Sequence, residues 1–123
     1  MTDQGPYRTG AEPSTDIIVT TGNDIAGHEV LRYLGLVRGI VVRAAGLDKS
    51  IMGAFKALGG GNIREYVDVC ERARHEAYTM MLQHARELGA GAIIGVRYDA
   101  TDFGGATEVL AYGTAVSIAP ARG

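Results

Sequence analysis

The sequence predicts an α+β domain in which an antiparallel sheet carries one long and one short helix. Four segments rich in β-branched and aromatic residues predict strands, and one long stretch between the second and third repeats its apolar residues at helical spacing. Glycine is in excess, with 18 residues among 123, and several glycines stand between or inside these segments. The expected order is strand, strand, helix, helix, strand, strand.

The first two strands are expected at residues 17–21 and 28–43. The first is a short β-branched edge strand that ends at the turn residues 22–24. The second carries apolar residues on both of its alternating faces, which predicts burial on both sides. It is longer than an ordinary strand, so we expect a bend at Gly35 or Gly39. A small domain cannot easily cover such a strand alone, which suggests that a second chain covers part of it.

Two helices are expected next. Residues 49–58 have apolar side chains at i, i+3 and i+4 and form a short amphipathic helix that ends at the glycines 59–61. Asn62 then caps the main helix, and Gly89 supplies the left-handed residue after its end. The apolar stripe of this helix contains several alanines, so whatever it packs against can approach closely.

The last two strands are expected at residues 92–99 and 107–118, joined by a hairpin loop over residues 100–106. Residues 1–15 have the proline, glycine and polar content of a disordered tail, and residues 120–123 form a second, C-terminal tail. The predicted folded domain is therefore residues 16–119.

Charge and composition argue against several classes of function. The net charge is -2 and basic residues do not cluster, so we expect no nucleic-acid partner. No apolar run approaches the length of a membrane span, and the N-terminus lacks the pattern of a signal peptide, so we expect no membrane association. The single cysteine cannot form an intrachain disulfide. A cytoplasmic location follows as the expectation.

Several short motifs together resemble the YbjQ-like family. They are Val37-Arg38-Gly39, Gly59-Gly60-Gly61, Arg72-Ala73-Arg74, Ala85-Arg86-Glu87-Leu88-Gly89-Ala90, Ala92-Ile93-Ile94-Gly95-Val96 and Gly113-Thr114-Ala115-Val116. The resemblance covers about residues 17–119. It implies a small α+β protein that assembles as a homo-oligomeric ring, a pentamer, and it implies a heavy-metal-binding role without an established activity.

Metal binding has few candidate ligands in this sequence. Soft metals need three or four convergent Cys, His or carboxylate groups. The soft candidates are Cys70, His28, His75 and His84, and no CxxC, HxxxH or HExxH motif is present. We therefore assign no metal ligand within one chain and no cofactor. A ring could still bring copies of one residue together, so a metal ion shared between subunits stays open as a hypothesis.

The glycine-rich segment before the long helix is a candidate anion site. Gly60, Gly61, Asn62 and Arg64 could hold a small anion at the helix N-terminus, although the segment is neither a P-loop nor a GxGxxG motif. The simpler interpretation is a connector with a helix cap.

No catalytic residue can be assigned, since the serines and Cys70 stand in no nucleophile motif. Asp99, Asp102 and Glu108 could form paired carboxylates at a subunit junction, or simply serve as polar residues of the hairpin loop. The leading interpretation is a non-enzymatic homo-oligomeric binding or scaffold protein of unknown ligand. The alternative is an enzyme or small-anion-binding protein with a site between subunits near Asn62 and Arg64.

Overall fold

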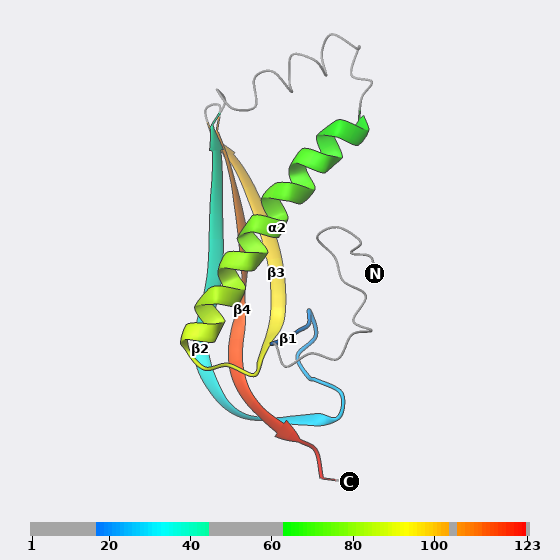
Figure 1. Cartoon of the computed structure of the whole chain (residues 1–123), viewed down its shortest axis with the longest axis vertical. Coiled ribbons are helices and arrows are strands. Elements are labelled where there is room, and N and C mark those ends of the chain that lie inside the picture. Colours follow the sequence, from blue (N-terminus) through cyan, green and yellow to red (C-terminus); the bar gives the residue numbers. More distant parts are fainter. Residues whose placement is uncertain (1–16, 45–62, 104–105, 123) are drawn as a thin grey trace.

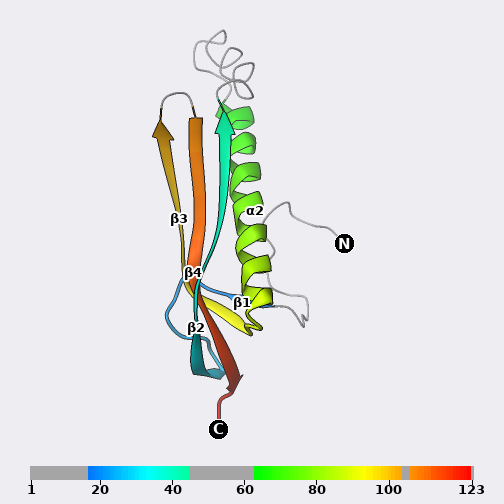
Figure 2. The same cartoon turned by 90° about the vertical axis from the view of Figure 1, so that its left-hand side faces the viewer.

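The computed structural model describes residues 17–44, 63–103 and 106–122 (Figure 1). In chain order, the elements are β1 (Ile18–Val19), β2 (His28–Ala44), α2 (Ile63–Glu87), β3 (Ala92–Phe103) and β4 (Ala106–Pro120). The helix lies on one face of a four-stranded sheet (Figure 2), which confirms the α+β class. The predicted short helix 49–58 and the predicted tail 1–15 lie outside the described residues.

The strands are arranged in the order β1-β3-β4-β2. β4 pairs antiparallel with β2 over its whole length and with β3 on its other side. β1 is an edge strand, as predicted, but it pairs parallel with β3, so the sheet is mixed and not wholly antiparallel. β1 is also shorter than predicted, although hydrogen bonds to β3 continue beyond it, with Thr20 O accepting from Val96 N at 3.1 Å.

The β3–β4 hairpin is longer than the sequence predicts. Residues 100–103 belong to β3, and β4 begins at Ala106, so the expected loop 100–106 is wrong. The double glycine in this segment of the sequence predicted a loop, but residues 100–102 belong to an exposed end of β3, where a strand tolerates Asp and Thr. At its other end β4 extends through Pro120, and Ala121 N donates to Gly27 O at 2.9 Å.

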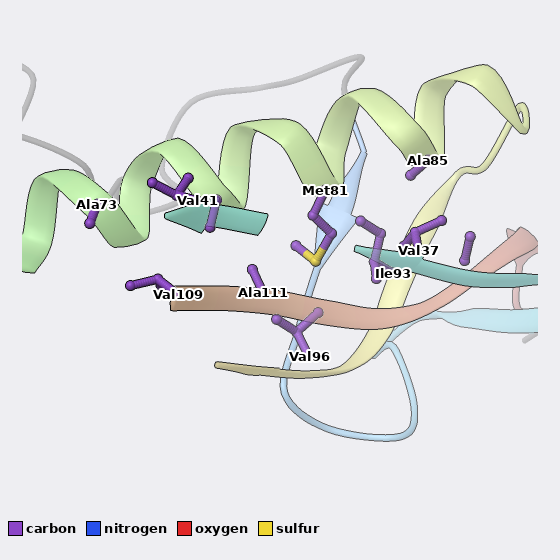
Figure 3. Close-up of a cluster of buried hydrophobic side chains, with 11 residues drawn as sticks. Val37, Val41, Ala73, Met81, Ala85, Ile93, Val96, Val109 and Ala111 are labelled. Atoms are coloured by element: carbon purple, nitrogen blue, oxygen red, sulfur yellow. The ribbon is translucent and has the colours of Figure 1, made fainter. Parts of the chain in front are cut away.

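The core lies between α2 and the sheet (Figure 3). The helix buries small residues and one large one, namely Ala73, Ala77, Ala85 and Met81. Gly39 of β2 lies directly under this helix, since a Cβ on Gly39 would stand 2.7 Å from Met80 Cβ and 2.8 Å from Met81 N. The predicted close approach of the alanine-containing stripe is therefore confirmed, with β2 as the element it approaches.

β2 bends through two register irregularities in its first half, between Val30 and Arg32 and between Tyr33 and Gly35. Gly35 has φ 133°, a value that side-chain-bearing residues rarely adopt, so the predicted bend at Gly35 is confirmed. β2 pairs regularly with β4 from Leu36 to Ala44.

The C-terminus of α2 ends as the sequence predicts. Gly89 has φ 76°, its N–H donates to Arg86 O at 3.0 Å, and Ala90 N donates to Ala85 O at 3.1 Å. These are the two hydrogen bonds of a Schellman motif, which satisfies carbonyls that the helix leaves without partners. The motif directs the chain from the helix straight into β3.

Candidate functional site

The candidate anion site at the start of α2 is only partly within the described residues. Gly60, Gly61 and Asn62 lie outside them, and Arg64 belongs to the first turns of the helix. The proposed role of these four residues therefore stays a prediction.

The sequence holds three histidines and one cysteine, and all four of these soft metal-ligand candidates lie within the described residues. Cys70, His75 and His84 lie along α2, and His28 begins β2 at the opposite end of that strand from Ala44. Across residues 17–44, 63–103 and 106–122, no three His, Cys, Asp or Glu side chains are grouped so that they could hold a metal ion. One subunit's described residues therefore do not fit a heavy-metal site.

His84 contacts the backbone of a strand. Its Nδ1 accepts from the backbone N–H of Arg38, at 3.3 Å, across the interface between α2 and β2. His28 also has a local contact, with its Nδ1 3.0 Å from Ala26 O. These contacts give both imidazoles structural roles near the backbone, and neither ring belongs to a group of three potential metal ligands in the described part of the chain.

The three candidate carboxylates do not form one cluster. Asp102 accepts from Thr107 Oγ1 at 2.7 Å, on the face of the sheet that α2 covers. Asp99 is opposite Leu110 and Glu108 is opposite Thr101, and all four of these side chains lie on the other face. The strands thus place Asp102 on one face of the sheet and Asp99 and Glu108, in adjacent rows, on the other.

The largest unexplained surface is the sheet face opposite α2, which we call the open face. Side chains alternate between the two faces along a strand, so the residues next to each sheet residue buried under α2 point to the open face. Its residues are Leu36, Arg38, Ile40 and Val42 of β2; Glu108, Leu110, Tyr112 and Thr114 of β4; and Arg97, Asp99 and Thr101 of β3. No described helix packs against these residues (Figure 2). Further along the same face, Ala92, Ile94 and Val116 are buried, and Ile25, Val30 and Ile118 pack against them.

On the open face, β2 carries three aliphatic residues and Arg38, and β3 carries Arg97, Asp99 and Thr101. Leu36, Ile40 and Val42 are 59%, 38% and 54% exposed. By contrast, the residues between them, Val37 and Val41, are buried under α2. β2 was predicted to be buried on both faces. The described residues bury only the face under α2, and the apolar side chains of the other face are exposed.

Arg97 at the edge of the open face fixes the chain that precedes β2. Its Nη1 donates to Thr21 O at 2.9 Å and to Val96 O at 2.8 Å. Gly95 N also donates to Gly22 O at 2.8 Å. Arg97 therefore has a structural role, which the sequence alone did not reveal because its acceptors are backbone carbonyls.

Residues 17–119 match the model of the YbjQ family, described as "Putative heavy-metal-binding". The chain is 51% identical over 107 residues to a UPF0145 protein of Chromobacterium violaceum, a match that covers 86% of this chain and 92% of the relative. A UPF0145 protein of Legionella pneumophila strain Lens is 50% identical over 103 residues, covering 83% of this chain and 98% of the relative.

A solved structure shares the fold. It is a protein of unknown function from the DUF74 family of Pediococcus pentosaceus, with a TM-score of 0.53 and 20% identity, covering 84% of this chain and 98% of that chain. In the described part of the present chain, no helix is long and apolar enough to cross a membrane.

Proposed function

Because this chain belongs to the YbjQ family, we propose that it is a non-enzymatic homo-oligomeric binding protein, a cytoplasmic ring of five copies that holds its ligand between subunits. Heavy-metal ions are the ligand class named in the family's description. The single cysteine, which cannot form an intrachain disulfide, suits a reducing compartment.

The observation that carries the assembly is the apolar part of the open face. Three aliphatic side chains of β2, at Leu36, Ile40 and Val42, lie on this face with Arg38 between the first two, and Leu110 and Tyr112 of β4 lie beside them. Large contiguous apolar patches on soluble proteins mark interaction surfaces, because burying them removes apolar area from water. The family resemblance implies that the partner is a second copy of the same chain.

The position of the ligand between subunits follows from the scatter of the soft side chains. A transition metal is normally held by three or four convergent ligands. Residues 28, 70, 75 and 84 carry all the histidines and the cysteine of the chain, and no metal-binding group occurs among the described residues. Cyclic symmetry repeats each ligand once per subunit around an axis, so one or two ligands per subunit would suffice.

Light scattering of purified protein tests the assembly. We expect a mass near five times the 13.0 kDa of one chain. Val42→Asp places a charge on the open face and should lower the mass toward that of one chain. Val67→Asp is the matched control, since Val67 is also exposed, at 45% against 54%, but lies on α2. A monomeric wild-type protein would overturn the proposal.

The ligand is tested separately on the assembled protein. Native mass spectrometry of freshly purified protein shows whether a metal or an organic molecule remains bound. Calorimetric titration with zinc or copper ions should give saturable heat for the wild type and none for the dissociated Val42→Asp variant. Equal metal affinity of both proteins would show that one subunit supplies all ligands, and absence of saturable heat in both would remove metal as the ligand.

A further inference from the structure

Arg38 places a positive charge inside the aliphatic part of the open face. Its neighbours on the same face of β2 are Leu36 and Ile40, which are 59% and 38% exposed. Arg38 is exposed as well. Its backbone N–H donates to His84, but across residues 17–44, 63–103 and 106–122 its guanidinium has no ion pair.

This charge decides what can cover the aliphatic residues beside it. Removing a guanidinium from water without an opposite charge costs free energy, which offsets the gain from burying the neighbouring apolar area. A molecule that covers both Leu36 and Ile40 also covers Arg38, which lies between them on the same strand. Such a molecule must therefore combine an anionic group with an apolar body.

Tyr112 stands beside Arg38 and adds a second donor. The two residues are directly opposite each other on β2 and β4, so their Cβ atoms lie about 4.5–5.5 Å apart. Tyr112 is half-buried, and its hydroxyl has no hydrogen-bond partner in the described part of the chain. A guanidinium binds a carboxylate through two parallel hydrogen bonds, and a phenol can donate one more to the same group.

Arg97 adds a second positive charge in the same row of the sheet, because it is opposite Tyr112 on β3. Its Nη1 donates to the carbonyl oxygens of Thr21 and Val96, which hold the side chain without neutralising its charge. The acidic residues of the open face, Asp99 and Glu108, lie in the next two rows. An anionic group is therefore attracted to the row of Arg38 and Tyr112 and repelled from the rows beyond it.

Aliphatic side chains continue from this row along the sheet. Ile40 is opposite Leu110 in the next row, and Val42, which is 54% exposed, follows on β2. The four residues from Arg38 to Val42 cover roughly 13 Å at about 3.3 Å per residue. Because Ile40, Leu110 and Val42 have no side-chain hydrogen-bonding group, they suit a hydrocarbon chain.

We propose that the open face binds an aliphatic carboxylate, with its carboxylate on the Arg38 guanidinium and the Tyr112 hydroxyl and its chain along Ile40, Leu110 and Val42. All of these residues belong to one chain. The inference rests on the proposed function only for the enclosure of this ligand, which would lie between the open face and a neighbouring copy. The carboxylate is a free molecule, because Asp99 and Glu108 on the same face would repel a membrane surface of many anionic headgroups.

Calorimetric titration of the full-length protein with sodium decanoate, below its micelle concentration, tests the ligand class. Acetate has the same head without the chain, and decyltrimethylammonium has the same chain with a positive head. We expect decanoate to bind at least tenfold more tightly than either comparison molecule. Hexanoate should bind at least tenfold more weakly than decanoate, because fewer methylene groups leave water.

Two variants test the residues. Arg38→Gln should lower the affinity for decanoate at least tenfold, and Tyr112→Phe, which removes only the hydroxyl, should lower it several-fold. Arg72→Gln is the matched control, since Arg72 is also exposed but lies on α2, and its affinity should stay within twofold of the wild type. Circular dichroism and light scattering of each variant report whether the fold and the assembly persist.

Several results would overturn the inference. Equal affinity for decanoate and decyltrimethylammonium would show that the face is only an apolar patch, and equal affinity for acetate would show an ion site without a chain site. Unchanged affinity in Arg38→Gln would place the ligand elsewhere. Dissociation of the assembly in Arg38→Gln, with no decanoate bound to the wild type, would assign Arg38 to a contact between copies. Sedimentation with vesicles of anionic phospholipid, without affinity for decanoate, would assign the face to a membrane.

The inference and the proposed homo-oligomer fail separately. A ring that binds no decanoate would overturn the inference and leave the homo-oligomer standing. A monomeric wild-type protein that binds decanoate through Arg38 would do the reverse.

Discussion

Replacing Gly39 by alanine should destabilise the protein strongly, because this glycine is where β2 and α2 touch. The added Cβ would lie 2.7 Å from Met80 Cβ and 2.8 Å from Met81 N, where ordinary van der Waals contact begins at 3.4 Å. The Ala77 carbonyl oxygen is closer still. Two of these three atoms belong to the helix backbone and cannot rotate aside. Restoring the Met80 and Met81 contacts to 3.4 Å requires the helix and β2 to separate by roughly 0.7 Å, and the Ala77 oxygen requires more.

Moving the helix away should cost a free energy near the upper end of the range found for overpacked cores. Inserting one carbon into a packed core typically costs about 1–3 kcal/mol. We expect about 3 kcal/mol here, since moving α2 also loosens Met81 and the buried alanines. A Gly→Ala change also lowers the conformational entropy of the unfolded chain, which stabilises the folded state by only about 0.4–1 kcal/mol and cannot offset the clash.

Urea unfolding at a fixed protomer concentration measures this loss. Gly22→Ala is the matched control, because the nearest atom to its added Cβ is Thr20 Oγ1 at 3.5 Å, an ordinary contact. We expect the control to change the free energy of unfolding by less than about 0.5 kcal/mol. If the two variants unfold within 0.5 kcal/mol of each other, α2 does not rest on Gly39 and the reasoning is refuted.

Three further predictions follow from other contacts of α2. Met81→Ala, at a fully buried side chain, should lower the free energy of unfolding by about 2–5 kcal/mol in the same assay. Arg43 Nη2 and Glu76 Oε1 are 2.7 Å apart but partly exposed, so a double-mutant cycle should give a coupling of only about 0.2–1 kcal/mol that shrinks with added salt. His84→Ala removes the acceptor of the Arg38 N–H, so the hydrogen of the Arg38 amide should exchange with solvent faster while the core amides change little. Unchanged exchange at Arg38 would show that the 3.3 Å contact does not protect this amide.

The long helix could be predicted from the sequence because local rules decide it. Apolar spacing sets its buried face, and Gly89 sets its end, where the structure shows the expected left-handed residue. The pairing of β1 with β3 could not be predicted, because a strand of two β-branched residues can pair with more than one other strand. Tertiary contacts alone decide which pairing forms. The hairpin was misjudged for a related reason, since Asp102 looks like a loop residue until its hydrogen bond with Thr107 places both residues on paired strands.

The candidate site shows the same limit. The sequence names every soft metal ligand but gives no distance between them, and only the fold shows that Cys70 and His28 belong to different elements with no third ligand grouped beside either in the described residues. The sequence did carry one signal of an interaction surface. Apolar residues on both faces of β2 exceed what one helix can cover, and the exposed side chains at Leu36 and Val42 are the consequence.

Features that protect a strand edge are distributed unevenly along β2. Exposed edge strands invite uncontrolled pairing, and proteins blunt them with bulges, prolines, charged side chains or a covering element. The first half of β2 has two register irregularities, and His84 occupies its edge at Arg38. From Gly39 to Val42 the strand has no bulge, proline or charge, and its side chains alternate between a buried glycine or valine and an exposed aliphatic residue. Because one half of the edge is protected and the other is regular, the protected half limits the register in which any added strand could pair with β2.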